Sequence, residues 1–117
     1  MPAVFALPDA PPDLEVQVDA AEVLPQIAAF LAKHPGLQEV LHDGIQHLRK
    51  AFPESRCFIL ALEADPEIPG WDYLVVSVKT ALRVADAHAR LDTFADAWWL
   101  AHIAQFGDVL LFDLEYV

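Results

Sequence analysis

Histidine is the residue type in this chain best suited to acid–base chemistry or metal binding, and five histidines are present. Asp43 and His47 are four residues apart, so they would share one face of a helix, with His42 beside them. The stretch does not match the HExxH pattern of zinc enzymes, and no Cys or His pair has zinc-finger spacing. An ordinary surface pair between Asp43 and His47 explains the spacing. We therefore expect no metal site.

His88 and His102 are the remaining candidates for a general base. His88 is close in sequence to Arg90 and Asp92, and His102 follows Trp98 by one helical turn. Neither histidine has a recognisable nucleophile with a partner to orient it, which nucleophilic catalysis requires. The four glycines form no phosphate-binding loop. The sequence thus assigns no catalytic residue and no cofactor, and it favours a non-enzymatic role.

Two other groups have ordinary explanations. Asp65, Glu67 and Asp72 could offer oxygen ligands to a divalent cation, but they lack the DxDxDG spacing, so a solvated turn is expected. Cys57 lies in an apolar run without a neighbouring base and is expected to be an inert, buried thiol. A single cysteine cannot form an internal disulfide, which favours a cytoplasmic location.

Trp98 and Trp99 form the most distinctive dipeptide of the chain. Consecutive helical residues point about 100° apart, so the two rings cannot share one narrow stripe. Trp98 continues the apolar stripe of its helix and is expected in the core. Trp99 either widens the buried face or lies in a contact surface.

The elements that position these residues follow from hydrophobic periodicity. Residues 14–18 alternate as a half-buried strand, and Asp19 with Glu22 predicts a capping box for the first helix. Pro25 conflicts with a regular helix begun at Asp19, so either it is the first helical residue or the helix is kinked there. Residues 35–51 predict a second helix. Residues 57–64 and 71–79 predict a hairpin joined by the turn at 65–70.

The C-terminal part returns to helical and then to strand periodicity. Residues 82–106 predict one continuous helix, followed by a strand at 109–117. The apolar stripe of this helix consists of Val84, Ala87, Leu91, Phe94, Trp98 and Ala101.

The order β-α-α-β-β-α-β predicts a single α+β domain over residues 1–117, with residues 1–12 as an irregular N-terminal lead-in. Merging the two early helices into one layer gives the ferredoxin-like, or split βαβ, arrangement. We therefore expect a four-stranded antiparallel sheet with both helical layers on one face. If residues 14–18 do not join it, a three-stranded sheet is the alternative.

One sheet face would then lack a helical cover, although about half of its side chains are apolar. Such patches are uncommon on monomers and predict a contact face. The interface candidates are Ile59, Ala61, Tyr73, Val75, Leu111 and, from the helix, Trp99. An alternative use of the same face is a small-ligand or enzyme site, in which Lys79 would lie among carboxylates; its candidates are Tyr73, Lys79, Asp113 and Glu115.

Charge and composition limit the partners. The 7 basic and 18 acidic residues give a formal net charge of −11, which repels nucleic acids and anionic membrane surfaces. No apolar run reaches the length of a membrane span, and no cationic and apolar signal sequence opens the chain. The apolar fraction of 56% is high for a domain of 117 residues and suggests burial against another chain.

Residues 82–117 resemble a family of small, uncharacterised prokaryotic proteins, largely of cyanobacterial type. These carry a helix close to LSPEEALERLDRFDEEWWL before a C-terminal strand, where this chain reads LRVADAHARLDTFADAWWL. A fainter likeness covers residues 48–78. The matching positions are Leu82, Arg90, Leu91, Asp92, Phe94, Asp96, Trp98, Trp99 and Leu100. The resemblance implies a stand-alone accessory or antitoxin-like protein without an established activity.

Together these observations predict an acidic protein-interaction module. It would be a homodimer, or an accessory subunit that binds another protein, and it would not bind nucleic acid alone. The small-ligand or enzyme site remains the alternative.

Overall fold

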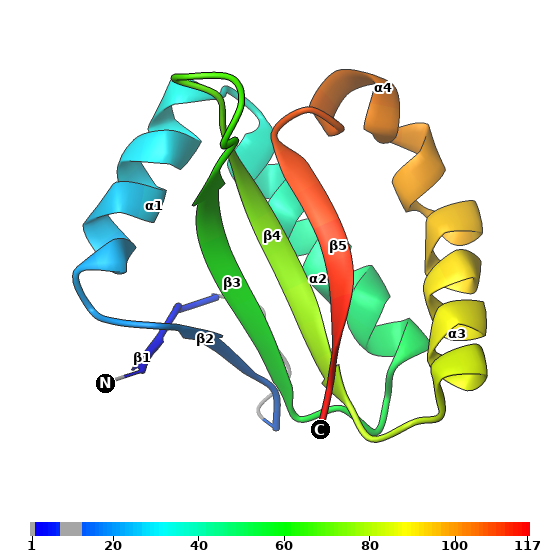
Figure 1. The fold of residues 1–117 in the computed structure, drawn as a ribbon. Coiled ribbons are helices and arrows are strands. Elements are labelled where there is room, and N and C mark those ends of the chain that lie inside the picture. The colour runs from blue at the N-terminus through cyan, green and yellow to red at the C-terminus, as the bar shows by residue number, and fades with distance from the viewer. Residues whose placement is uncertain (1, 8–12) are drawn as a thin grey trace.

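The computed structural model describes residues 2–7 and 13–117 and has an α+β fold with one mixed sheet (Figure 1). The strands are β1 (Ala3–Val4), β2 (Glu15–Val18), β3 (Cys57–Ala64), β4 (Asp72–Thr80) and β5 (Leu110–Tyr116). The helices are α1 (Val23–Lys33), α2 (Leu37–Ala51), α3 (Val84–Ala97) and α4 (Ile103–Phe106), with a 3₁₀ turn, η1, at Trp99–Ala101.

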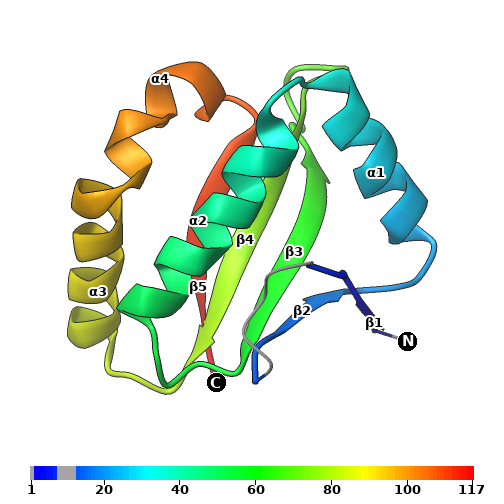
Figure 2. The ribbon, with the colours of Figure 1, turned by 180° about the vertical axis from the view of Figure 1, so that it is seen from behind.

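All helices lie on one side of the sheet. Helix α2 crosses behind the sheet in Figure 1 and in front of it in Figure 2, with α1 and α3 on either side. Burial alternates along the strands accordingly: from Leu74 onward the even-numbered residues of β4 are buried, and the odd-numbered residues are partly exposed. The predicted division of the hairpin into a helix-facing side and an open side is therefore confirmed.

The strand order corrects the expected ferredoxin-like sheet. The strands lie in the order β1-β2-β3-β4-β5, with β2 parallel to β3 and β4 parallel to β5, whereas β1–β2 and β3–β4 pair antiparallel. In a split βαβ unit another strand lies between the two that a helix connects, whereas here the connected strands pair directly. Periodicity marks which residues form strands but not which strands pair, so the element order fitted both arrangements.

Residues 14–18 do join the sheet, and the N-terminal lead-in adds a strand that periodicity did not indicate. Ala3 and Val4 pair antiparallel with Val18 and Gln17, and the amide of Phe5 donates to the carbonyl of Val16 at 2.7 Å. A strand of two residues is too short to show an alternating pattern, which explains the missed assignment. Residues 8–12 of the predicted lead-in lie outside the described residues.

Helix α1 begins at Val23, so Pro25 is its third residue and not its first. Glu22 is its N-cap residue without a side-chain cap, so the predicted capping box is wrong. Pro25 lies in the first turn, where backbone N–H groups have no partner within the helix, and its missing donor therefore costs no helical bond.

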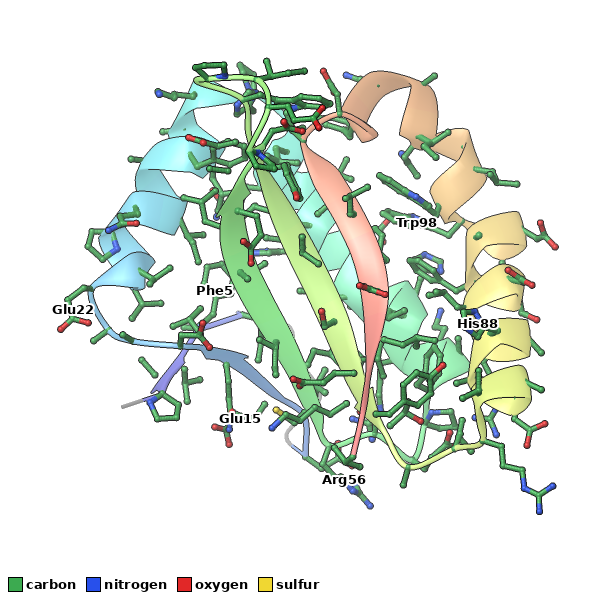
Figure 3. All side chains as sticks on the ribbon, viewed as in Figure 1. Phe5, Glu15, Glu22, Arg56, His88 and Trp98 are labelled. Carbon is green, nitrogen blue, oxygen red and sulfur yellow. The ribbon has the colours of Figure 1, made fainter. Side chains whose placement is uncertain are left out.

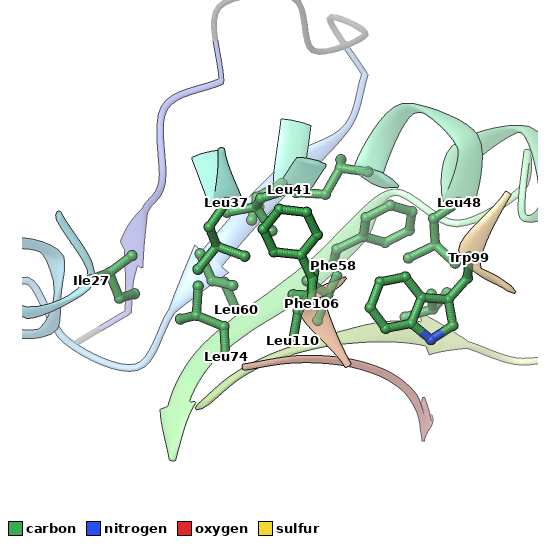
Figure 4. Packing of buried hydrophobic residues seen from close by; sticks show 14 of the residues in the cluster. Ile27, Leu37, Leu41, Leu48, Phe58, Leu60, Leu74, Trp99, Phe106 and Leu110 are labelled. Atoms are coloured by element: carbon green, nitrogen blue, oxygen red, sulfur yellow. The ribbon is translucent and has the colours of Figure 1, made fainter. Parts of the chain in front are cut away.

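The core fills the space between the helices and the sheet (Figure 4). Helix α2 contributes most, because its apolar residues recur at spacings of three and four and form one continuous buried face. Fully buried side chains include Ile27, Leu37, Leu41, Ile45, Leu48, Phe52, Phe58, Leu60, Leu74, Val76 and Leu110.

The predicted helix over residues 82–106 is interrupted at Trp98, whose φ of −145° and ψ of −53° end α3. Ala87, Phe94 and Trp98 of the predicted stripe are buried, Leu91 is partly buried, and Val84 and Ala101 are exposed. Because the backbone leaves the helical path here, Trp98 and Trp99 both enter the core, with exposed fractions of 6% and 8%. Trp99 is thus a core residue, and its assignment as an interface candidate is corrected.

Candidate protein-binding face of the sheet

The candidate site is the sheet face opposite the helices, which we call the open face and which is turned toward the viewer in Figure 1. Its side chains follow from strand alternation, since successive residues point to opposite sides of a sheet. On the four longer strands it comprises Glu15, Gln17, Cys57, Ile59, Ala61, Glu63, Tyr73, Val75, Ser77, Lys79, Leu111, Asp113 and Glu115.

The strand register brings five predicted interface residues together as one apolar patch, defined by Ile59, Ala61, Tyr73, Val75 and Leu111. Val75 is opposite Ala61 on one side and Leu111 on the other, so these three form a row across three strands. Tyr73 and Ile59 lie one step beyond this row in opposite directions, because they pair with Glu63 and Ser77 respectively. Leu111 keeps 43% of its surface exposed, and the other four are partly exposed.

Trp71 extends the patch toward the β3–β4 turn. Its ring centre is 6.5 Å from that of Tyr73, and 37% of its side chain remains exposed. The indole N–H donates to the carbonyl of Asp108 at 2.7 Å, which fixes the ring against the segment that leads into β5. The aromatic surface at this end is therefore held in place by a hydrogen bond.

A polar row crosses the opposite end of the open face. In the strand register Glu15 is opposite Cys57, and Lys79 is opposite Glu115. Because the next residues, Phe58 and Val78, are paired, Cys57 is also opposite Lys79. Burial raises the pKa of the Cys57 thiol, Lys79 opposes this shift, and Glu15 and Glu115 add to it. The thiol is only partly buried, unlike the expectation, but its raised pKa keeps it protonated and poorly nucleophilic at neutral pH.

The candidate residues of the alternative ligand site do not lie close together in the structure. Tyr73 and Lys79 are six residues apart on β4, about 20 Å at the rise of a strand. In the strand register Lys79 is opposite Glu115, and Asp113 is two residues before Glu115 on β5. These three residues share one end of the face, whereas Tyr73 lies at the other end. The four residues therefore cannot surround one small ligand.

A hollow lies elsewhere, between the C-terminal end of α2 and α3. Its volume is about 630 Å³, and it is lined by Lys50, Ala51, Pro53, Leu82, Asp86, Ala89, Arg90 and Thr93. Arg90 is already paired with Glu54 at its edge and also donates to the carbonyl of Ala51. None of the candidate ligand residues contributes to this hollow.

Two of the histidines, His47 and His102, pack against Trp98. Trp98 lies between α3 and β5 (Figure 3). The indole N–H donates to Oδ2 of Asp43 at 2.7 Å, and Oδ1 of Asp43 is 3.5 Å from Nε2 of His47. His47 stacks on the indole at 5.6 Å between ring centres, and His102 lies at 4.4 Å. Within residues 2–7 and 13–117, no three His, Cys, Asp or Glu side chains gather as a possible metal site.

Gly44 is a determinant of this packing that sequence reasoning missed. A Cβ atom at this position would lie 2.7 Å from Cη2 of Trp98 and 3.1 Å from Cζ of Phe112. In the sequence, the one sign of this close approach was a glycine among the apolar residues of the predicted helix.

The described ion pairs lie away from the open face. Asp13 accepts from Arg49 at 2.8 Å and from Arg56, and Glu54 accepts from Arg90. The hydrogen bond from Arg49 lowers the pKa of Asp13, and the hydrogen bond from Arg90 lowers the pKa of Glu54. Three of the seven basic side chains are thereby committed to other carboxylates.

Comparisons with protein-family models, curated proteins and solved structures found no match for this chain. The likeness of residues 82–117 to small prokaryotic proteins therefore stays a prediction. Among the residues that the structure describes, no helix has both the length and the apolar character to cross a bilayer.

Proposed function

We propose that this chain is a non-enzymatic interaction module whose open face binds another protein chain. The observation that carries the proposal is the apolar patch, which lies across three strands and which none of the helices in the described part of the chain covers. Glu63, Lys79, Asp113 and Glu115 border the patch, and this layout resembles the apolar core and polar rim of a protein interface.

Physical chemistry favours covering this patch. Removing apolar surface from water contributes about 25 cal/mol per Å², which must exceed the entropic cost of association. Extended strands also present a preorganised surface, so little conformational freedom is lost on binding. The partner is either a second copy or a different protein that this chain assists or restrains, and a cytoplasmic, antitoxin-like role belongs to the same proposal.

The ligand-binding or enzymatic alternative has less support. Its four candidate residues are divided between the two ends of the face, and the thiol nearest to them has a raised pKa. Nothing in this arrangement gathers a nucleophile, a base and a group to orient them.

A charge at the centre of the patch tests the proposal. Val75→Lys should abolish association, because a buried ammonium without a partner is costly at an interface. Val84→Lys is the matched control, since Val84 is 58% exposed on α3, away from the open face. Self-association is measured by sedimentation, and binding of a different protein is measured by co-purification of tagged variants from the native host.

The expected result is that wild type and Val84→Lys associate equally while Val75→Lys is a folded monomer that captures no partner. Circular dichroism verifies that the variant keeps its helices. A wild-type protein that neither self-associates nor retains a partner contradicts the proposal, as does a Val75→Lys variant that behaves like wild type.

A further inference from the structure

The charges of the open face indicate what kind of partner it fits. We infer that it binds a protein surface in which apolar side chains are flanked by lysine and arginine, and not a second copy of this chain. The inference rests on the proposed function and adds the chemistry of the partner.

The described part of the open face carries four carboxylates, Glu15, Glu63, Asp113 and Glu115, against one ammonium group, that of Lys79. These five charges sum to −3. Two copies meeting through this face would bring two such surfaces together, on chains that each have a net charge of −11. Like charges across an interface oppose association, whereas a basic partner would be attracted.

These carboxylates are also available to a partner. The ion pairs among the described residues use the carboxylates of Asp13, Asp43 and Glu54, which lie off the open face. Glu15 accepts one hydrogen bond from Gln17, and Asp113 accepts one from the amide of Leu114. Glu63, Asp113 and Glu115 are all exposed. A guanidinium group could therefore bind any of them without displacing an existing ion pair.

The positions of the acids define the pattern that a partner must match. Glu63 borders the patch beside Tyr73, while Asp113, Glu115 and Glu15 border its other end. A complementary surface therefore has apolar side chains over Val75 and basic side chains toward both ends of the strands. The negative face would also steer such a partner into the correct orientation before contact.

Two probe peptides test the inference, a short peptide of alternating leucine and lysine and its leucine–glutamate counterpart. A face variant, Glu63→Gln/Asp113→Asn/Glu115→Gln, removes three negative charges from the open face. The matched control, Asp86→Asn/Asp92→Asn/Asp96→Asn, removes three from exposed positions on α3 and leaves the same net charge. Peptide affinity is measured by fluorescence anisotropy at low and high salt, and self-association by sedimentation.

We expect wild type to bind the lysine peptide, to ignore the glutamate peptide and to bind more weakly as salt rises. The face variant should lose about tenfold or more in affinity, and the α3 control should change by about twofold or less. Equal losses in both triple variants, no binding of the lysine peptide, or tight self-association of wild type would each overturn the inference. Unchanged binding in Val75→Lys would instead contradict the proposed function, so the two failures are distinguishable.

Discussion

Gly44 lets Trp98, one of the two core tryptophans, approach helix α2 directly. The Trp98 ring lies against the α2 backbone at this residue, anchored by Asp43 one position earlier and flanked by His47 one turn later. Three residues of α2 within about one turn thus hold the indole: Asp43 accepts its hydrogen bond, Gly44 leaves room for it, and His47 stacks on it. The pair of Asp43 and His47, which the sequence suggested as an ordinary surface pair, contacts this indole.

Replacing Gly44 with alanine tests this interpretation. Alanine normally stabilises a helix interior by about 1 kcal/mol relative to glycine. Here we expect the opposite, a loss of about 1–3 kcal/mol in unfolding free energy, because the new Cβ would overlap the Trp98 ring. Chemical denaturation of both proteins measures the difference.

The control is the same change in a Trp98→Leu background, where the ring is absent and Gly44→Ala should become neutral or stabilising. Such non-additivity is the signature of two residues in contact. If Gly44→Ala stabilises the protein that retains Trp98, the close approach does not limit this position.

At the level of single elements, periodicity predicted the strands at Cys57–Ala64 and Asp72–Thr80 and the helix at Leu37–Ala51 closely, since each buries one regular face. It did not predict the break at Trp98, because the apolar spacing of three and four residues continues through this position and periodicity carries no information on backbone dihedral angles. It also gave no account of strand pairing, which depends on contacts between residues far apart in the sequence. The apolar patch was nevertheless predicted, since alternation alone decides which side of a strand each residue faces.

Asp13 connects three elements, because it precedes β2 and binds Arg49 of α2 and Arg56 beside β3. Its pKa is lowered in the folded protein, chiefly by the hydrogen bond from Arg49. The unfolded chain therefore binds protons more readily than the folded one in this range. The resulting stabilisation is present above about pH 4, the ordinary range of an aspartate, and is lost as the pH falls through the folded value.

Asp13→Asn should remove this contribution. The difference in unfolding free energy between wild type and variant should be largest above about pH 5 and should shrink toward pH 2–3, as measured by denaturation across that range. Asp92→Asn, at an exposed position of α3, removes one charge without removing a described ion pair and serves as the control. A difference for Asp13→Asn that does not vary with pH would show that the ion pairs are not its source.

For the whole molecule, the acidic balance sets what the chain can bind alone. The formal charge of −11 should prevent binding to duplex DNA or to single-stranded RNA, since contacts to phosphates need a concentrated basic surface. Three of the seven basic side chains are held by Asp13 and Glu54, which weakens any such surface further. Anisotropy titrations at low salt measure this, and tight binding that weakens with added salt would reveal a basic region that the fold does not suggest.

The strand order has a consequence for how the chain reaches its native state. Each strand pairs with the one that precedes it in sequence, so the spatial order of the strands is also their order of synthesis. No strand has to be inserted between two that are already paired, as the ferredoxin-like arrangement would require. Each pairing closes only the connection between consecutive strands, which limits the chain entropy lost at each step. The sheet can therefore assemble by successive addition at one edge while the rest of the chain is still emerging from the ribosome.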